Sequence, residues 1–360
     1  MSSQYKRIAV KVGSNVLTRQ DGTLDVTRMS ALVDQIADLH KTGVEIVLIS
    51  SGAVASGRSE LKPVKKLDSV DQRQLFSAIG QAKLINRYYE LFRDHGMVAG
   101  QVLTTKESFS TRRHYLNQRN CISVMLENGV IPIVNENDTI SVTELMFTDN
   151  DELSGLIASM IDAEALIILS NIDGIYNGSP SSSGTHVIRE VEPGKDLSDY
   201  IQTEKSGFGR GGMLTKTSIA RKVADEGITV FIANGKKDNI LVHLLNDTEH
   251  TVCTRFVPAV GEISSVKKWI AHSDGFAKGE IHLNRHAAEA LCGQQAVSLL
   301  SVGVVKIEGD FEKDDIVKII DDQGILLGVG RISVDSAQAR QMIGQHGLRP
   351  LVHYDYLYLE

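Results

Sequence analysis

The stretch IAVKVGS, residues 8–14, decides the fold and introduces the chemistry. Its apolar run is bounded by turn residues, the pattern of a short buried strand. Lys11 lies inside this strand, where an unpaired ammonium group would be costly to bury. It is therefore either a strand-end lysine whose ammonium reaches water or a contact for an anion. Gly13 and Ser14 favour phosphate as that anion, because small residues after a strand let backbone N–H groups approach phosphate oxygens.

Similar apolar runs recur along the first 233 residues, and amphipathic helical segments lie between them. The alternation predicts an α/β fold with a mostly parallel sheet that helices cover on both faces, a three-layer αβα sandwich. Ligands of such sheets bind at the carboxyl ends of the strands, so function is sought just after each strand. The predicted strands are residues 8–12, 44–49, 97–103, 130–134, 165–169 and 228–233.

The pattern changes after residue 233, through a connecting stretch that carries Pro258 and Gly261. Beyond it, short strands are predicted at 279–283, 302–307, 316–320 and 326–332, closely spaced as in a small mixed β-barrel. The sequence thus predicts a large α/β domain at 1–258, a linker at 259–274 and a small second domain at 275–360.

Composition limits the classes of function. A formal charge of −7 gives no general attraction to nucleic acid or to an anionic membrane. Residues 275–360 carry eight Lys and Arg against twelve Asp and Glu, the wrong balance for binding a phosphate backbone. The three cysteines are far apart, which argues against a disulfide framework and indicates buried apolar residues. Because no apolar run fits a secretory signal or a membrane span, we expect a cytoplasmic protein with a small-molecule role.

Polar clusters follow several predicted strands. SSGA at 50–53 places hydroxyls at a strand end, where an N-capping serine is the competing interpretation. NEND at 135–138 is a turn or, as we favour, a ligand contact. DND at 149–151 precedes a strongly amphipathic segment, so one carboxylate is expected to cap a helix, but three polar residues exceed what a cap needs.

A glycine-rich loop, SGFGRGGMLTK at 206–216, combines a hydroxyl and a lysine at a predicted helix start, which favours a phosphate cradle. Residues 207–212 match the dinucleotide pattern G-x-G-x-x-G in letters, but no strand precedes them and they lie far from the first βα unit. The Walker A pattern is not met either. If ATP binds here, it binds by another scheme.

Taken together and in this order, these segments resemble the amino-acid kinase superfamily, and within it the branch that phosphorylates glutamate. The second domain resembles the PUA domain that many bacterial members of this branch carry, so the resemblance covers nearly the whole chain. The segments that carry it are VKVGS (10–14), SGAV (51–54), VNEND (134–138), DND (149–151), DGIY (173–176), GGMLTK (211–216) and, in the second domain, GDF (309–311) and GVGR (328–331).

The resemblance implies transfer of the γ-phosphoryl group of ATP, with Mg²⁺, to the side-chain carboxylate of L-glutamate, which gives L-glutamyl 5-phosphate in the first step of proline biosynthesis. It implies that Lys11 and Lys216 contact phosphates and that Asp151 orients them. It further implies that glutamate binds to Ser51, Asp138 and Asn150, in a pocket that Asn135 and Asp149 help to shape. ATP would be held by Lys11, Gly13, Ser14, Ser170, Asn171, Arg210, Gly211, Gly212, Met213, Leu214, Thr215 and Lys216.

Two departures from the family pattern concern the nucleotide. The family commonly has Thr-Asp where this chain has Ser170-Asn171, and Thr where it has Arg210. The resemblance also implies proline as a feedback inhibitor, a dimer or tetramer, and handover of the labile product to a reductase. The alternatives are a superfamily kinase acting on carbamate, aspartate, acetylglutamate or a nucleotide monophosphate, and an RNA-binding protein of the PUA type.

Overall fold

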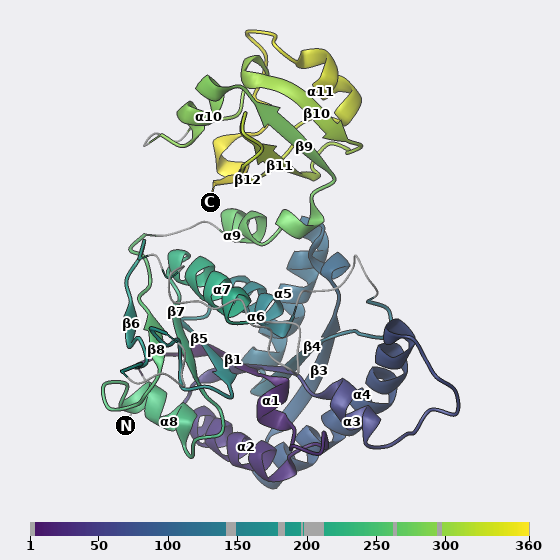
Figure 1. The fold of residues 1–360 in the computed structure, drawn as a ribbon, viewed down its shortest axis with the longest axis vertical. Helices are drawn as coiled ribbons and strands as arrows, with labels where there is room; N and C mark the ends of the chain where they lie inside the picture. Colours follow the sequence, from purple (N-terminus) through teal and green to yellow (C-terminus); the bar gives the residue numbers. More distant parts are fainter. Residues whose placement is uncertain are drawn as a thin grey trace. The chain divides into compact units, whose positions relative to one another are not determined.

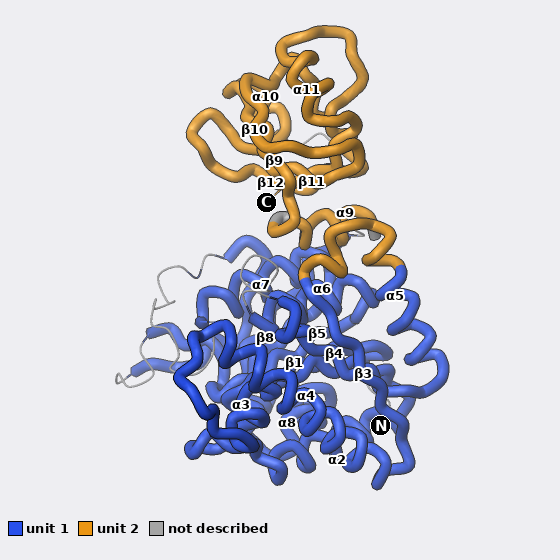
Figure 2. The backbone as a smooth tube through the Cα atoms, turned by 90° about the vertical axis from the view of Figure 1, so that its right-hand side faces the viewer, with its two compact units in different colours: residues 1–105, 117–262 blue, residues 106–116, 263–360 orange. Residues whose placement is uncertain are grey.

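A computed structural model describes residues 4–141, 149–178, 184–195, 197, 212–261, 265–293 and 297–359. The chain forms two compact units, drawn in different colours in Figure 2: unit 1 contains residues 1–105 and 117–262, and unit 2 contains 106–116 and 263–360. Unit 2 thus includes most of the predicted linker, where helix α9 (Ser265–Ala271) forms. It also includes 106–116, a segment from the middle of the predicted first domain.

Unit 1 is built on an eight-stranded sheet with the order β3-β4-β2-β1-β5-β7-β8-β6. The first six strands of this order run parallel and confirm the predicted parallel sheet, each within two residues of its predicted bounds. The short strands β8, antiparallel to β7, and β6 were not predicted. The strands are β1 (Arg7–Val12), β2 (Glu45–Ser50), β3 (Val98–Thr104), β4 (Val130–Glu136), β5 (Ala165–Ser170), β6 (Glu190–Val191), β7 (Thr229–Asn234) and β8 (Thr254–Phe256).

Helices cover both faces of this sheet, as Figure 1 shows. On one face lie α2 (Val26–Lys41), α4 (Ser69–Asp94) and α8 (Ile240–Asn246). On the other lie α6 (Asn150–Met160) and α7 (Met213–Asp225). Two short helices, α1 (Ser14–Leu17) and α3 (Ala53–Arg58), follow directly after β1 and β2. The three-layer prediction is confirmed.

The alternation of side chains along β1 explains how Lys11 reaches the site. In a strand, successive side chains point to opposite faces of the sheet. Val10 and Val12 belong to the apolar cluster that packs with Met29 of α2. Lys11 therefore points to the other face, where α6 packs against β1. One face of β1 therefore contributes Val10 and Val12 to the hydrophobic core, and the other face contributes Lys11 to the candidate site.

Unit 2 contains a second, five-stranded mixed sheet with the order β10-β9-β11-β12-β13. The four predicted strands correspond to β9 (Gly279–Leu283), β10 (Val304–Gly309), β11 (Ile316–Ile320) and β12 (Leu326–Arg331), and β13 (Leu357–Leu359) completes the sheet. Gly328 is required where β12 meets β13, because its φ is 158° and a Cβ there would lie 2.1 Å from the carbonyl oxygen of Tyr358. Two short helices, α10 (Arg285–Leu291) and α11 (Ser336–Met342), accompany the sheet.

Residues 106–116 join unit 2 through aromatic side chains. They comprise a 3-10 turn (Lys106–Phe109) and the start of α5 (Arg112–Glu127). The indole Nε1 of Trp269 donates a hydrogen bond to the carbonyl oxygen of Phe109 (3.0 Å), and the Trp269 ring centroid lies 6.5 Å from that of Tyr115. Arg112 lies over both rings. These contacts join sequence segments more than 150 residues apart.

The cysteine prediction was right for one residue only. Cys253 is buried, but Cys121 and Cys292 are exposed. Cys121 lies on the solvent side of α5, and Cys292 follows the last residue of α10. Within the described ranges, no helix is both long enough and apolar enough to cross a bilayer.

Candidate functional site

One buried carboxylate holds two lysines at the carboxyl ends of the central strands. Lys11 Nζ lies 2.5 Å from Oδ1 of Asp151, and Lys216 Nζ lies 2.8 Å from Oδ2 of the same residue. Asp151 is fully buried, in the first turn of α6, and the three side chains are at most 12% exposed. The structure brings together the three predicted catalytic residues, which come from β1, α6 and α7.

This arrangement fixes the charge state of Asp151. Burial alone would raise its pKa, but the charges of Lys11 and Lys216 and their hydrogen bonds outweigh burial and lower the pKa to about 2. The carboxylate is therefore ionised at neutral pH and leaves one net positive charge on the group of three. The N-termini of α6 and α7 lie at the same site and add positive dipole ends. The site is suited to a polyanion.

Asp149 performs the capping role that was predicted for one residue of DND. Its Oδ1 accepts hydrogen bonds from the backbone N–H groups of Asp151 (2.8 Å) and Glu152 (3.1 Å), at the N-cap of α6. Burial, and then the charge of Asp151, raise its pKa to about 6. Its Oδ2 is buried and has no hydrogen-bond partner among the described residues.

Asn150, the middle residue of DND, is hydrogen-bonded to two other predicted substrate residues. Its Nδ2 donates to Ser51 Oγ (2.9 Å) and to Asn135 Oδ1 (3.0 Å). Asn135 is 2% exposed and donates in turn to Gln81 Oε1 of α4 (2.8 Å). Ser51 is not an N-cap, since Gly52 occupies that position of α3. The competing interpretation of this serine is therefore wrong, and its hydroxyl belongs to a polar chain at the strand ends.

Asp138 is paired with an arginine that the sequence did not single out. Arg73 of α4 places its Nε 3.1 Å from Asp138 Oδ1, and both side chains are 15% exposed. Burial raises the pKa of Asp138, and the positive charge of Arg73 opposes that rise. The guanidinium Nη2 also donates to the carbonyl oxygen of Ser141 (2.6 Å). Opposite charges thus lie side by side at this end of the polar chain.

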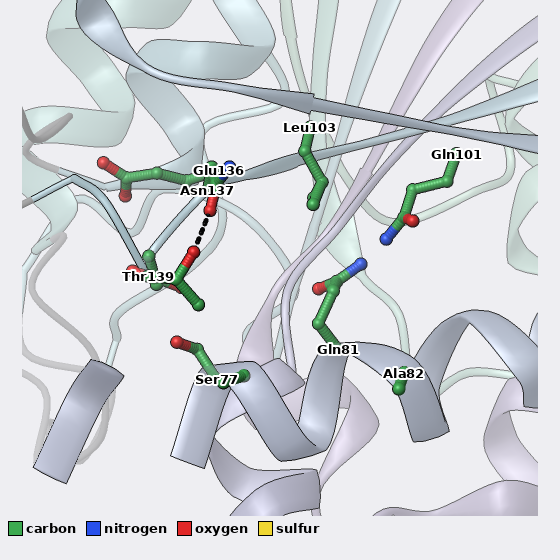
Figure 3. A pocket seen from close by; sticks show the side chains of 10 residues that line it. Ser77, Gln81, Ala82, Gln101, Leu103, Glu136, Asn137 and Thr139 are labelled. Atoms are coloured by element: carbon green, nitrogen blue, oxygen red, sulfur yellow. Dashed lines mark hydrogen bonds between the residues drawn. The ribbon is translucent and has the colours of Figure 1, made fainter. Parts of the chain in front are cut away.

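A pocket of about 210 Å³ lies between α4 and the ends of β3 and β4. In Figure 3, Ser77 and Gln81 rise from the helix toward Gln101, Leu103 and the strand-end residues, and Asn137 is hydrogen-bonded to Thr139. Asp138 belongs to the same lining. Because Gln81 also holds Asn135, the pocket and the Asn150–Ser51 group share one side chain.

The predicted nucleotide residues follow β1 and β5 and begin α7. Gly13 donates its backbone N–H to the carbonyl oxygen of Leu169 (3.0 Å), and a Cβ on Gly13 would lie 3.6 Å from Lys11 Nζ. Ser170 ends β5 and is followed by Asn171. Gly212 caps α7, which begins with Met213, Leu214, Thr215 and Lys216. Arg210 and Gly211 lie outside the described residues.

The carboxyl ends of β5 and β7 are tied together by Asp173, part of the DGIY segment. Its Oδ1 accepts from Asn234 Nδ2 (2.9 Å), and its Oδ2 lies 3.1 Å from Lys237 Nζ. Burial alone would raise the pKa of Asp173, but the hydrogen bonds from Asn234 and Lys237, together with the lysine charge, outweigh burial and lower the pKa. This tie places a further cation, Lys237, beside the loop that carries Ser170 and Asn171.

Residues 6–234 match the Amino acid kinase family, and residues 279–353 match the PUA domain. The chain belongs to the amino acid kinase family. Among its curated relatives, glutamate 5-kinase of Bacteroides thetaiotaomicron is 75% identical over 100% of both chains. Glutamate 5-kinase of Chlorobaculum tepidum is 47% identical over 99% of this chain and 98% of its own.

A solved structure, UMP kinase from Bacillus anthracis, covers 71% of this chain and 97% of its own at a TM-score of 0.49 and 14% identity. The assignment to the amino acid kinase family rests instead on the family match and on the curated relatives.

Sequence reasoning missed Arg73 and Gln81. Both are polar residues within a long helix, where such residues usually face solvent. The available signal was their spacing: residues 73, 77 and 81 recur every four positions and share a helix face. Ser77 and Gln81 line the pocket, and Arg73 pairs with Asp138, which also lines it.

Proposed function

We propose that this chain transfers the γ-phosphoryl group of ATP to the side-chain carboxylate of L-glutamate and produces L-glutamyl 5-phosphate. The observation that carries the proposal is the buried Lys11–Asp151–Lys216 group beside the Asn150–Ser51–Asn135 chain. The positively charged lysine group suits the phosphates of ATP, and the hydrogen-bonded polar chain suits a polar acceptor. Curated relatives named glutamate 5-kinase, similar over the whole chain, support the same acceptor.

The chemistry needs no general base. The side-chain carboxyl of glutamate has a pKa of about 4.3, so it is already a nucleophilic anion at neutral pH. The obstacle is repulsion between this anion and the triphosphate, and catalysis then depends on positioning and on cations at the transferring group. We assign that role to Lys11 and Lys216. Asp151 holds both ammonium groups in place, and its own charge leaves a net positive site.

We assign acceptor binding to Ser51, Asn135, Asp138 and Asn150, with Asp149 fixing the start of α6. The nucleotide is assigned to the strand-end loops at Gly13, Ser14, Ser170 and Asn171 and to residues 210–216. Residues 1–258 would then form the catalytic domain.

Mg²⁺ is expected to arrive with ATP. Most of its ligands would come from the phosphates and water. On the protein, Oδ2 of Asp149 is buried and has no hydrogen-bond partner among the residues that the structure describes, so it fits one further contact.

The product is an acyl phosphate, which hydrolyses readily, so we propose that a reductase consumes it in the first steps of proline biosynthesis. Proline would then act as a feedback inhibitor at or near the acceptor pocket. We also propose a cytoplasmic homo-oligomer, dimer or tetramer.

The decisive test is acyl-phosphate formation trapped as the hydroxamate with hydroxylamine. The purified protein is given ATP and Mg²⁺ with glutamate, aspartate, acetylglutamate or carbamate, each with and without proline. We expect turnover with glutamate alone, suppressed by proline. If another acid is turned over and glutamate is not, the protein is still a kinase of this family, but glutamate is rejected as its substrate.

A further inference from the structure

In the ion pair between Arg73 and Asp138, the arginine has a buried N–H donor that no described residue accepts. Among the described residues, Arg73 makes two polar contacts: its Nη2 donates a hydrogen bond to the carbonyl oxygen of Ser141, and its Nε lies 3.1 Å from Oδ1 of Asp138. The buried Nε nevertheless has no hydrogen-bond partner among the described residues, so its N–H is not aimed at the carboxylate. A guanidinium group is rich in N–H donors, and burying even one of them, here Nε–H, without an acceptor is costly. The pair is therefore poorly explained as a device for stability alone.

The place of the pair suggests what completes it. Asp138 and Ser77 line the pocket between α4 and the strand ends, and Ser77 lies one helical turn after Arg73. Gln81, a further turn along, connects the pocket to Asn135 and, through it, to Asn150 beside the lysines. An acceptor whose reacting carboxylate lies near Lys11 and Lys216 would therefore extend its other end toward Asp138 and Arg73.

The chemistry of an α-amino acid matches that end. Its α-carbon carries an ammonium and a carboxylate, and recognition of both needs an anion and a cation close together. We propose that Arg73 binds the α-carboxylate of the amino-acid acceptor while Asp138 binds its α-ammonium. The proposal deepens the proposed function, on which it rests: it assigns to Arg73 the discrimination between glutamate and acids without an α-carboxylate.

The test separates the two charged groups with acceptor analogues. Glutarate is glutamate without the α-ammonium, and 4-aminobutanoate is glutamate without the α-carboxylate. The variants are Arg73→Gln and Asp138→Asn, and the readout is kcat/KM, or the competitive inhibition constant against glutamate where an analogue turns over too slowly.

Arg73→Gln is expected to lower kcat/KM for glutamate by roughly 10- to 100-fold, the usual worth of a hydrogen bond to a charged group. Glutarate should lose as much, and 4-aminobutanoate should change little. Asp138→Asn should give the complementary result, with losses for glutamate and 4-aminobutanoate and little change for glutarate.

Arg87→Gln is the matched control, since Arg87 lies on the same helix, is 42% exposed and pairs with Glu90. It should leave all three acceptors unchanged. Arg73→Lys should give an intermediate loss of kcat/KM for glutamate, and this variant replaces Arg73→Gln in the test if Arg73→Gln does not fold. Equal losses for glutamate and 4-aminobutanoate in the Arg73 variants would show that Arg73 only holds the loop, and would overturn the inference. Inactivity of the unaltered protein on glutamate would instead reject the proposed function, and this inference with it.

Discussion

Replacing Asp151 by Asn removes the one negative charge between two buried ammonium groups. The lowering of the pKa of Asp151 from 3.8 to about 2 corresponds to roughly 2 kcal/mol of preference for the ionised form. Loss of one partner from a buried ion pair costs about 3 to 5 kcal/mol. We therefore expect Asp151→Asn to destabilise unit 1 by about 2 to 5 kcal/mol, which lowers its Tm by roughly 5 to 15 °C.

The catalytic rate of Asp151→Asn should fall by more than its loss of folding stability alone would explain. Because Asp151 fixes both lysines, its loss lets them separate, and misplacement of about 1 Å can cost about 100-fold in rate. The assay is hydroxamate formation at saturating ATP and glutamate, with thermal unfolding measured with and without ATP and Mg²⁺. ATP should raise the Tm of Asp151→Asn more than that of the unaltered protein, since phosphates replace the lost anion.

Asp162→Asn is the control for Asp151→Asn. Asp162 is 43% exposed and pairs with Arg119, and such surface pairs contribute less than about 1 kcal/mol. A kcat for Asp151→Asn within about threefold of the control would refute the reasoning, as would an equal Tm shift from ATP in both variants.

Three further predictions concern Ser51 and Asp149 in the candidate site and Gly328 in unit 2. Ser51→Ala should raise the KM for glutamate by roughly 10-fold with little change in the KM for ATP, because it removes the acceptor of the Asn150 hydrogen bond; equal changes in both KM values would contradict this. The pKa of Asp149 is about 6 in the folded protein and 3.8 in the unfolded chain, so the folded state binds the proton more tightly. Protonated Asp149 therefore contributes about 3 kcal/mol to the free energy of unfolding below pH 4, and this contribution is lost as the pH rises through 6. Asp149→Asn should remove that pH dependence in denaturant unfolding while still capping α6, and an unchanged profile would show that Asp149 does not cause it. Gly328→Ala should destabilise unit 2, since its Cβ would lie 2.1 Å from the Tyr358 carbonyl oxygen, and a limited-proteolysis pattern like that of the unaltered protein would refute this.

Apolar runs between turn residues were sufficient to predict the six parallel strands. Five of them are almost continuously buried, whereas β3, at the edge of the sheet, is mostly exposed or half-buried and was predicted from its apolar run alone. Apolar runs could not predict β6 and β8. These strands have two and three residues, too few to show a period, and they form only because a neighbouring edge is present.

The candidate site was predictable where polar residues end a strand, as at 135–138, or begin a helix, as at 149–151. Arg73 and Gln81 belong to neither class. Their place depends on how α4 packs against β3, at the edge of the sheet, and this tertiary contact leaves no local signal in the sequence. The assignment of 106–116 to unit 2 was hidden for the same reason, since nothing near Tyr115 in sequence indicates its contact with Trp269.

That contact limits how the gene can be shortened. A chain ending before residue 263 would lose Trp269, whose indole Nε1 donates a hydrogen bond to the carbonyl oxygen of Phe109 and whose ring packs on Tyr115. Phe109 and Tyr115 are buried in the whole protein, and both would remain in the shortened chain without this partner. The PUA-containing unit therefore cannot be treated as a detachable tail. An ancestor that acquired it or a descendant that loses it would need compensating substitutions at 106–116, and a comparison of family members with and without the unit should find the sequence difference there.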